Sequence, residues 1–466
     1  MTLNVIVIGA GPAGVMAASR AAELGARTTL VTRGAFGGMA ANDGPVPVRT
    51  LAQAARLLRG ARGLDRFGIT VPDPKLDYAR LRERVGQAVD DVRRHSSLRR
   101  DIDRLGVSVH EQAGTVRFLD PYTVEIDGGL TLRADKFVIC AGGVSRRLDV
   151  PGGELTATHS DAWSLKSIPE SIIVIGGGMT GAQVASIFRA FGSRIHMFQR
   201  GPRILPDEDE EVAAAVAQAF RAEGIDLREG FGSIDSFEKT HTGVRMHFSR
   251  DGARDSVEAT LAVTAVGWAA DTEGLNLQAA GVQLDKRGYI AVDDSLRTSA
   301  PHIFAAGDIT GRWMLVPQAV QGGRVAATNA VRGTATPFAG AVHPTGGFTE
   351  PEYASVGLTE AKARAANDIV IGMVRFEETA RTIIDDRTSG FCKLLVDRGT
   401  RRMLGCHVVG ERAVEMVQIV AIAMAGGLSV DDLLRVPLSF PTYTGILVRA
   451  AFRAAEQLGT QGPPPP

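Results

Sequence analysis

Cysteine is scarce in this sequence. Its 466 residues include three cysteines, Cys140, Cys392 and Cys406, which stand far apart along the chain. This spacing excludes a local metal knuckle and a C-x-x-C redox motif. The simplest interpretation is that all three are buried free thiols in a reducing compartment. We therefore predict a cytoplasmic protein without a metal site.

Two further features are absent: an excess of charge of one sign and a long apolar run. Lys and Arg together number 52, as do Asp and Glu, so no overall field would attract nucleic acid or an anionic membrane. The longest apolar stretch, 414–428, contains Glu415 and Gln418 and is too short and too polar to span a bilayer. A strand-like run begins at Asn4 without a basic leader, which indicates no signal peptide. We expect neither nucleic acid nor a membrane span.

Glycine, by contrast, is abundant, and two glycine-rich runs share one pattern. Residues 5–14 read VIVIGAGPAG and residues 172–181 read IIVIGGGMTG. Each combines a β-branched strand, a G-x-G-x-x-G turn and a helix-forming segment, and a second apolar strand follows. The first glycine allows the tight turn, the second lets backbone approach a pyrophosphate, and the third lets helix and strand pack closely. Two copies predict a flavin dinucleotide site and a nicotinamide dinucleotide site.

The remaining segments complete the predicted architecture. Residues 300–308 form a strand that ends in Gly307-Asp308, where the carboxylate can accept a hydrogen bond from a ribityl hydroxyl. From about residue 341 the pattern changes to strand-like runs at 368–375, 391–396 and 402–409, and a long apolar helix from Ala413. We predict an α/β protein with two Rossmann-like domains, a C-terminal α+β domain and a disordered tail at 459–466.

These segments resemble the pyridine nucleotide-disulfide oxidoreductases, a family that includes glutathione reductase, dihydrolipoamide dehydrogenase, mercuric reductase and soluble transhydrogenase. The resemblance runs from residue 1 to about 455 and is carried by the two fingerprints together with 37–38, 140–142, 307–308, 348–360 and 404–410. It implies a homodimer that uses FAD and NAD(P)H. The implied domains are FAD-binding (1–151 and 272–340), NAD(P)H-binding (152–271) and dimerisation (341–458).

The turns and the resemblance together predict the residues that bind the cofactors. Thr32 stands where the first Rossmann unit usually ends in an acid, so the bond to the adenosine ribose would be weaker. Gln199 is neutral, with Arg200 and Arg203 nearby, which favours NADPH over NADH. The predicted set is Gly9, Gly11, Ala13, Gly14, Thr32, Arg33, Gly38, Met39, Ala141, Gly142, Gly176, Gly178, Thr180, Gly181, Gln199, Arg200, Gly267, Gly307, Asp308 and Ala319.

The segments that carry disulfide chemistry in the family depart from its pattern. After Gly-Gly the family has a Cys-x4-Cys pair, whereas Ala40 and Pro45 occupy these positions here. The family's His-Pro-Thr-x-x-Glu run reads FPTYTG at 440–445, so Phe440 and Gly445 replace its acid–base pair. We therefore predict that the redox disulfide is missing and that a dithiol substrate is excluded.

Four side chains are candidates for the reaction itself. Arg49 and Gln183 stand where the family usually has a Lys–Glu ion pair beside the flavin, and Arg49 would stabilise negative charge there. Phe440 and Tyr443, supplied by a partner subunit, would line the electron-exit face or simply pack the dimer interface.

These observations predict an FAD-dependent NAD(P)H dehydrogenase that passes electrons directly to a small acceptor such as a quinone. Three alternatives remain open: a flavin enzyme with a dedicated organic or metal-ion substrate, a soluble NAD(P) transhydrogenase, and a non-catalytic flavoprotein or redox sensor. The intact phosphate-binding turns argue against the last.

Overall fold

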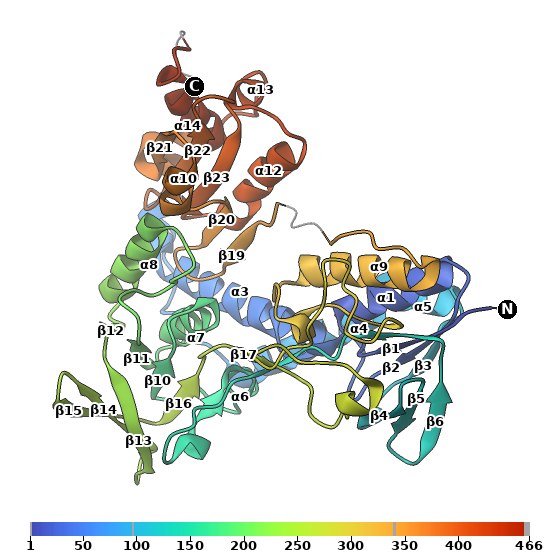
Figure 1. The fold of residues 1–466 in the computed structure, drawn as a ribbon. Helices are drawn as coiled ribbons and strands as arrows, with labels where there is room; N and C mark the ends of the chain where they lie inside the picture. The colour runs from blue at the N-terminus through green and yellow to red at the C-terminus, as the bar shows by residue number, and fades with distance from the viewer. Residues whose placement is uncertain (1, 96, 339–341, 461–466) are drawn as a thin grey trace.

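The computed structural model describes residues 2–95, 97–338 and 342–460. The chain folds into three bodies, seen at the right, the lower left and the top of Figure 1. The predicted disordered tail lies outside the described residues from residue 461 onward. The predicted fold class, two Rossmann-like domains and a C-terminal α+β domain, is confirmed, whereas the domain boundaries stay predictions.

The first body is built on a parallel sheet in the order β18-β7-β1-β2-β3. Alternate residues of its central strand β1 serve two cores, so residues 5–8 of that strand are apolar on both faces. Val5 and Val7 pack under α1, α5 and α9, whereas Ile6 and Ile8 face a small antiparallel sheet. The elements are β1 (Asn4–Ile8), α1 (Pro12–Glu23), β2 (Arg27–Val31), α5 (Ser97–Arg104), β3 (Ser108–His110), β4 (Val116–Asp120), β5 (Thr123–Ile126), β6 (Leu130–Arg133), β7 (Lys136–Ile139), β18 (Ile303–Ala305) and α9 (Val316–Arg332).

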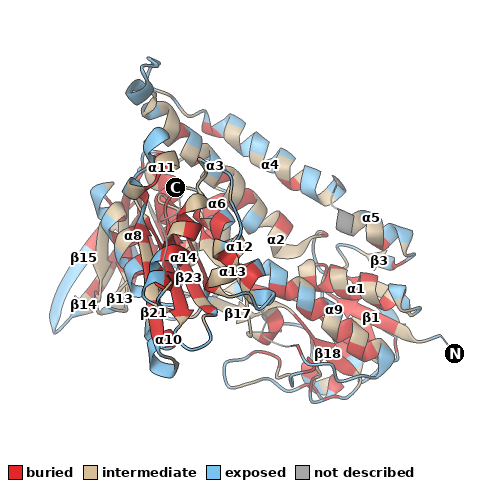
Figure 2. Ribbon diagram, turned by 90° about the horizontal axis from the view of Figure 1, so that it is seen from above, coloured by how far each residue is buried: buried red, intermediate tan, exposed pale blue. Residues whose placement is uncertain are grey.

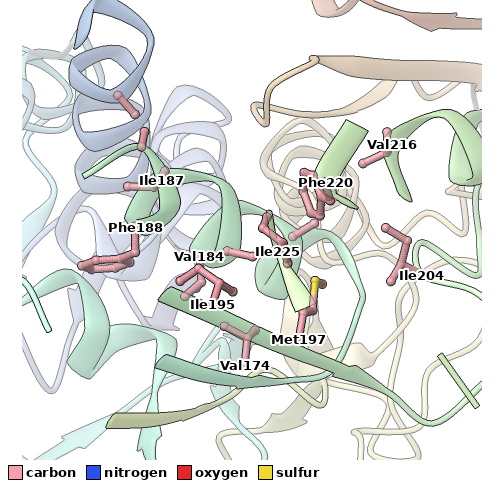
Figure 3. Close-up of a cluster of buried hydrophobic side chains, with 14 of the residues drawn as sticks. Val174, Val184, Ile187, Phe188, Ile195, Met197, Ile204, Val216, Phe220 and Ile225 are labelled. Atoms are coloured by element: carbon pink, nitrogen blue, oxygen red, sulfur yellow. The ribbon is translucent and has the colours of Figure 1, made fainter. Parts of the chain in front are cut away.

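The second body repeats this plan with a parallel sheet in the order β12-β11-β10-β16-β9. Figure 3 shows strand residues Val174, Ile195 and Met197 beneath Phe188 and Phe220 of the covering helices. The elements are β9 (Ala157–Thr158), α6 (His159–Trp163), β10 (Ser171–Ile175), α7 (Met179–Ala190), β11 (Arg194–Gln199), α8 (Glu210–Ala222), β12 (Asp226–Glu229) and β16 (Leu261–Thr264), with a side sheet of β13 (Ser233–Lys239), β14 (Val244–Arg250) and β15 (Ala253–Ala259).

The third body is an antiparallel sheet, ordered β19-β20-β23-β22-β21, packed against helices. The predicted strands and the helix from Ala413 are confirmed, with ends that differ by one residue at most. The elements are β19 (Thr345–Gly347), β20 (Tyr353–Gly357), α10 (Glu360–Ala366), β21 (Ile369–Arg375), α11 (Ala380–Ile384), β22 (Phe391–Asp397), β23 (Met403–Val409), α12 (Ala413–Ala425), α13 (Val430–Leu434) and α14 (Gly445–Glu456).

Two connections position the first body against the second. The chain leaves through β8 (Gly143–Ser145) and returns through β17 (Trp268–Ala270), and these strands pair antiparallel as a ribbon. Helix α3 (Pro45–Arg62) runs from the first body to α7, where Leu51 and Ala55 join the second body's core. Its neighbours are α2 (Gly38–Asn42) and α4 (Tyr78–His95), and α4 lies along the outside (Figure 2). Single 3-10 turns lie at η1 (Leu64–Phe67), η2 (Gly153–Leu155), η3 (Leu277–Ala280), η4 (Asp308–Thr310) and η5 (Phe376–Glu378).

Two predicted absences concern membranes and metals. Within the described residues, we find no helix with the length and apolar character that crossing a bilayer requires. The same part of the chain brings together no group of three or more His, Cys, Asp or Glu side chains suited to a metal ion. The cytoplasmic location stays a prediction.

Candidate active site

A cavity of about 1780 Å³ lies where the first two bodies meet. Both glycine turns form part of its wall, together with the ribbon and the start of α3. Every predicted cofactor-binding residue lines this cavity except Gly14 and Gly181. One space therefore reaches both predicted dinucleotide sites.

The glycines of the two turns divide into two kinds. A side chain on Gly14 would collide with the carbonyl of Gly9, and one on Gly181 would collide with that of Gly176. These glycines let the helix pack against the turn, which is why they do not face the cavity. In contrast, a Cβ on Gly11 or Gly178 would meet no protein atom within 4 Å. The space at Gly11 and Gly178 is open to a ligand, as a pyrophosphate requires.

Asp308 marks the flavin end of the cavity. Burial raises the pKa of its carboxyl group to about 6, and no hydrogen-bond donor from the described part of the chain contacts that group. A half-buried acceptor without a partner suits a hydroxyl-bearing ligand. Nearby, Thr32 is buried and Arg33 forms an ion pair with Asp271. The pocket therefore fits the ribityl and ribose parts of FAD.

The nucleotide end is organised around Gln199 at the end of β11. Its Oε1 accepts a hydrogen bond of 2.8 Å from the backbone N–H of Gly177, so the side chain braces the second turn. Arg203 donates to the carbonyls of Pro206 and Glu208, both at 3.0 Å. Arg203 thus holds its own loop, and of these two arginines it is Arg200 that lines the cavity.

Arg49 and Gln183 are brought together as the sequence suggested. Nη1 of Arg49 donates to Oε1 of Gln183 at 3.2 Å, and both side chains line the cavity. The guanidinium also stacks on the ring of Phe348. Burial lowers the pKa of Arg49 to about 10, so the side chain remains a cation at neutral pH. A role in the reaction stays a prediction.

Phe440 and Tyr443 lie away from this cavity within the chain. Phe440 is 64% exposed. The Tyr443 hydroxyl donates to Asp385 at 2.8 Å, in a second cavity of about 330 Å³. Whether a partner subunit would bring either side chain to the first cavity stays a prediction.

Among the polar residues of the cavity wall that the sequence did not indicate are Asp43, His159 and Ser160. Asp43 and Ser160 are 117 positions apart and form a direct hydrogen bond. No motif surrounds them, since their meeting depends on how the α2–α3 turn is placed against α6. Only a knowledge of the packing between the two bodies could have found them.

The cysteines are buried free thiols, as predicted. Cys140 lies at the cavity wall, where burial raises its pKa to about 12. Cys392 and Cys406 lie together in the third body's core, far along the chain from the glycine turns. Cys140 is therefore a protonated thiol at neutral pH, and Cys392 and Cys406 are enclosed in a core.

Comparison with known proteins identifies relatives over almost the whole chain. A family model described as "Pyridine nucleotide-disulphide oxidoreductase" matches residues 3–323. The model of that family's dimerisation domain matches residues 343–451.

Individual relatives include the dihydrolipoyl dehydrogenase of Thermus scotoductus, which is 34% identical and covers 97% of both chains. "Dihydrolipoyl dehydrogenase 2" of Haloarcula marismortui is 31% identical and covers 97% of this chain and 96% of the relative. The mercuric reductase of Lysinibacillus sphaericus is 31% identical over 92% of this chain and 78% of the relative.

A solved structure, the "HOCl-induced flavoprotein disulfide reductase RclA from Escherichia coli", has the same fold. Its TM-score is 0.85 at 24% identity, and the match covers 96% of this chain and 98% of that one.

These relatives contradict the predicted function. They are described as dihydrolipoyl dehydrogenases and mercuric reductases, not as quinone reductases. The prediction of direct transfer to a quinone without a redox disulfide is therefore wrong. That prediction depended on two short segments, 37–49 and 440–445, whereas the similarity to these relatives extends over almost the whole chain.

Proposed function

Because this chain belongs to the pyridine nucleotide-disulphide oxidoreductase family, we propose that it is a homodimeric reductase that oxidises NADPH and reduces a disulfide or a metal ion. Family members use FAD and NAD(P)H, and the chain is an FAD-dependent pyridine nucleotide oxidoreductase. The metal ion is the acceptor that the name mercuric reductase gives, and the disulfide is the oxidised form of the dithiol that the name dihydrolipoyl dehydrogenase gives. The observation that carries the proposal is the single cavity shared by both glycine turns.

The residues of the first body fit FAD. The open space at Gly11 admits a pyrophosphate, and the unpartnered carboxylate of Asp308 accepts a hydroxyl hydrogen bond. When bound, FAD supplies the capacity to accept a hydride from the nicotinamide and to hold its electrons for the acceptor. Arg49 places a half-buried positive charge on the wall of the same cavity.

The nucleotide end favours NADPH. The Gln199 side chain is neutral and is engaged with Gly177, so it does not repel a 2′-phosphate as a carboxylate would. Arg200 lines the cavity beside it and can pair with that phosphate. We expect NADH to be used more weakly.

The third body supports the proposed dimer. The dimerisation-domain model matches it, and it exposes several large apolar side chains: Ile383, Ile384, Ile422, Val436 and Phe440. Exposed apolar surface of this kind is typical of a protein–protein interface.

The proposal is tested with the full chain, purified and loaded with FAD. NADPH or NADH is added without oxygen, and the visible flavin absorbance is followed. Lipoamide or Hg²⁺ is then added as the acceptor. Bleaching by NADPH and recovery with either acceptor would support the proposal. A chain that binds no FAD, or whose bleached absorbance neither acceptor restores, would contradict it.

A further inference from the structure

A continuous set of hydrogen bonds lines one side of the cavity. The Ser160 hydroxyl donates to Oδ2 of Asp43, and Nε2 of His159 lies 3.4 Å from the Ser160 Oγ. On the other side of the ring, Nδ1 of His159 lies 2.7 Å from the Ser145 Oγ. All four residues line the cavity. They come from three places: the α2–α3 turn, the start of α6 and the ribbon.

The donors and acceptors of this set agree in direction. A carboxylate only accepts, so the Ser160 hydrogen points to Asp43 and its oxygen is free to accept from His159. His159 then carries a hydrogen on Nε2 and accepts from Ser145 at Nδ1. The three hydrogen bonds therefore run from Ser145, which is partly exposed, to Asp43 in the cavity.

Packing holds the imidazole ring in this position. His159 is 4% exposed, and its ring lies edge to face against Trp268 at 4.7 Å between centroids. Asp161 is the charged residue that neighbours both Asp43 and His159. Its carboxylate accepts hydrogen bonds from the backbone N–H and the hydroxyl of Thr158 and so caps α6.

The protonation behaviour of the two groups is consistent with proton exchange. Burial raises the pKa of Asp43 and lowers the pKa of His159. The two pKa values are therefore closer together than in water, where they differ by about 2.6 units. A proton passes more readily between groups of similar pKa.

The proposed reaction needs one proton from outside. Reduction of a disulfide follows NADPH + H⁺ + RSSR → NADP⁺ + 2 RSH: the hydride carries two electrons and one proton, the S–S bond breaks, and each sulfur gains one proton. We propose that Asp43 delivers the second proton to the acceptor and that Ser160 and His159 return a proton to Asp43. This inference rests on the proposed function and names Asp43 as the general acid of that reaction.

The closing experiment compares acceptors that differ in their need for protons. Lipoamide takes two electrons and two protons, and ferricyanide takes electrons alone. Dioxygen, which forms hydrogen peroxide, is a second proton-requiring probe that does not depend on a disulfide site. Asp43→Asn keeps the shape of the side chain and removes the proton. Ser160→Ala interrupts the route without touching Asp43, and Asp149→Asn at an exposed position is the matched control.

We expect Asp43→Asn to slow reduction of lipoamide and dioxygen by about 10²-fold, a usual size for a lost general acid, with ferricyanide reduction unchanged. The wild-type rate with lipoamide should fall as pH rises through the pKa of Asp43, and the variant should lose that fall. Ser160→Ala should show a smaller loss, and Asp149→Asn none. Equal losses with all acceptors, or no loss with the two proton-requiring ones, would overturn the proposal.

A second readout does not depend on turnover. Infrared difference spectra of the FAD-free chain, wild type minus Asp43→Asn, should show a protonated carboxyl band that persists above about pH 4, the ordinary range of an aspartate. A band that has already vanished at that pH would overturn the role of Asp43. A wild type that lipoamide does not oxidise contradicts the proposed acceptor alone, because dioxygen and the infrared band still test the proton route.

Discussion

At the scale of single residues, the two glycine turns show how one residue type serves two purposes. Gly11 and Gly178 leave space that a ligand can enter, whereas Gly14 and Gly181 let backbone meet backbone. The consequences of adding a methyl group should therefore differ between neighbouring positions of the same turn.

Gly178→Ala and Gly181→Ala test this difference. The methyl group of Gly178→Ala meets no protein atom within 4 Å, so we expect an unchanged melting temperature and a KM for NADPH raised about tenfold or more, ~1.4 kcal/mol. Gly181→Ala pushes against the Gly176 carbonyl and should destabilise the fold by about 1–3 kcal/mol. Thermal melts and steady-state kinetics of both variants measure these effects. Similar melting temperatures would contradict the different purposes assigned to Gly178 and Gly181.

Asp308 should make the stability of the FAD-free chain depend on pH. Its pKa is about 6 in the folded chain and about 3.9 when unfolded. The folded state therefore binds more protons between these values, so stability is fully present below about pH 4 and falls as pH rises through 6.

We expect Asp308→Asn to melt at a higher temperature than wild type at pH 8, where the difference approaches ~3 kcal/mol at most, and to lose this advantage at pH 4. Melting curves of the FAD-free proteins across that range are the measurement. A difference that does not change with pH would show that the Asp308 carboxyl titrates normally.

At this scale the sequence was informative only where chemistry follows a local pattern. The motif glycines, Asp308 and the Arg49–Gln183 pair stand in or beside recognisable motifs, and the structure brings all of them except Gly14 and Gly181 to one cavity. Asp43 and His159 have no such context, because a carboxylate and an imidazole acquire their relation from the contact between α6 and the α2–α3 turn. No local pattern encodes that contact.

At the scale of elements, a buried lysine joins the second body to the third. Lys393 on β22 has a side chain 2% exposed, and its Nζ lies 2.9 Å from both Asp209 and Glu211 and 2.5 Å from Glu360. Asp209 caps α8, and Glu360 begins α10. One cation therefore holds the starts of two helices from different bodies.

Lys393→Met should lower the free energy of unfolding by about 3–5 kcal/mol, because it leaves the Asp209 carboxylate buried without its partner. Adding Asp209→Asn should recover part of the loss, since the amide carries no charge and can still accept the backbone hydrogen bond from Glu360. Chemical denaturation of the two variants provides the comparison. If the double variant is no more stable than the single one, the buried charge is not the cause.

Element types were easier to predict than their partners. The strands and the helix from Ala413 follow from alternation and apolar runs, which are local properties. The sequence did not reveal that β22 carries a buried cation, because Lys393 interrupts an otherwise apolar strand and its partners lie on distant helices.

At the scale of the whole molecule, the exposed apolar side chains of the third body predict self-association. Light scattering should give the mass of two chains. Ile422 on α12 is 72% exposed, and Ile422→Glu would place a charge in the proposed interface, so we expect this variant to shift toward the monomer. Leu119→Glu, at a 44% exposed position in the first body, is the matched control and should remain a dimer. A wild type with the mass of one chain would contradict the prediction.

The ribbon of β8 and β17 has a consequence for the order in which the molecule forms during synthesis. Residues 146–267 lie between its paired strands, so this whole segment emerges from the ribosome before β17 exists. The edge strand β18 pairs with β7 and emerges later still. The second body, a continuous stretch of chain, can therefore complete its sheet first, while one edge of β7 remains unpaired. The time for which this edge of β7 remains unpaired, rather than the stability of the folded protein, would set the risk of aggregation in the cell.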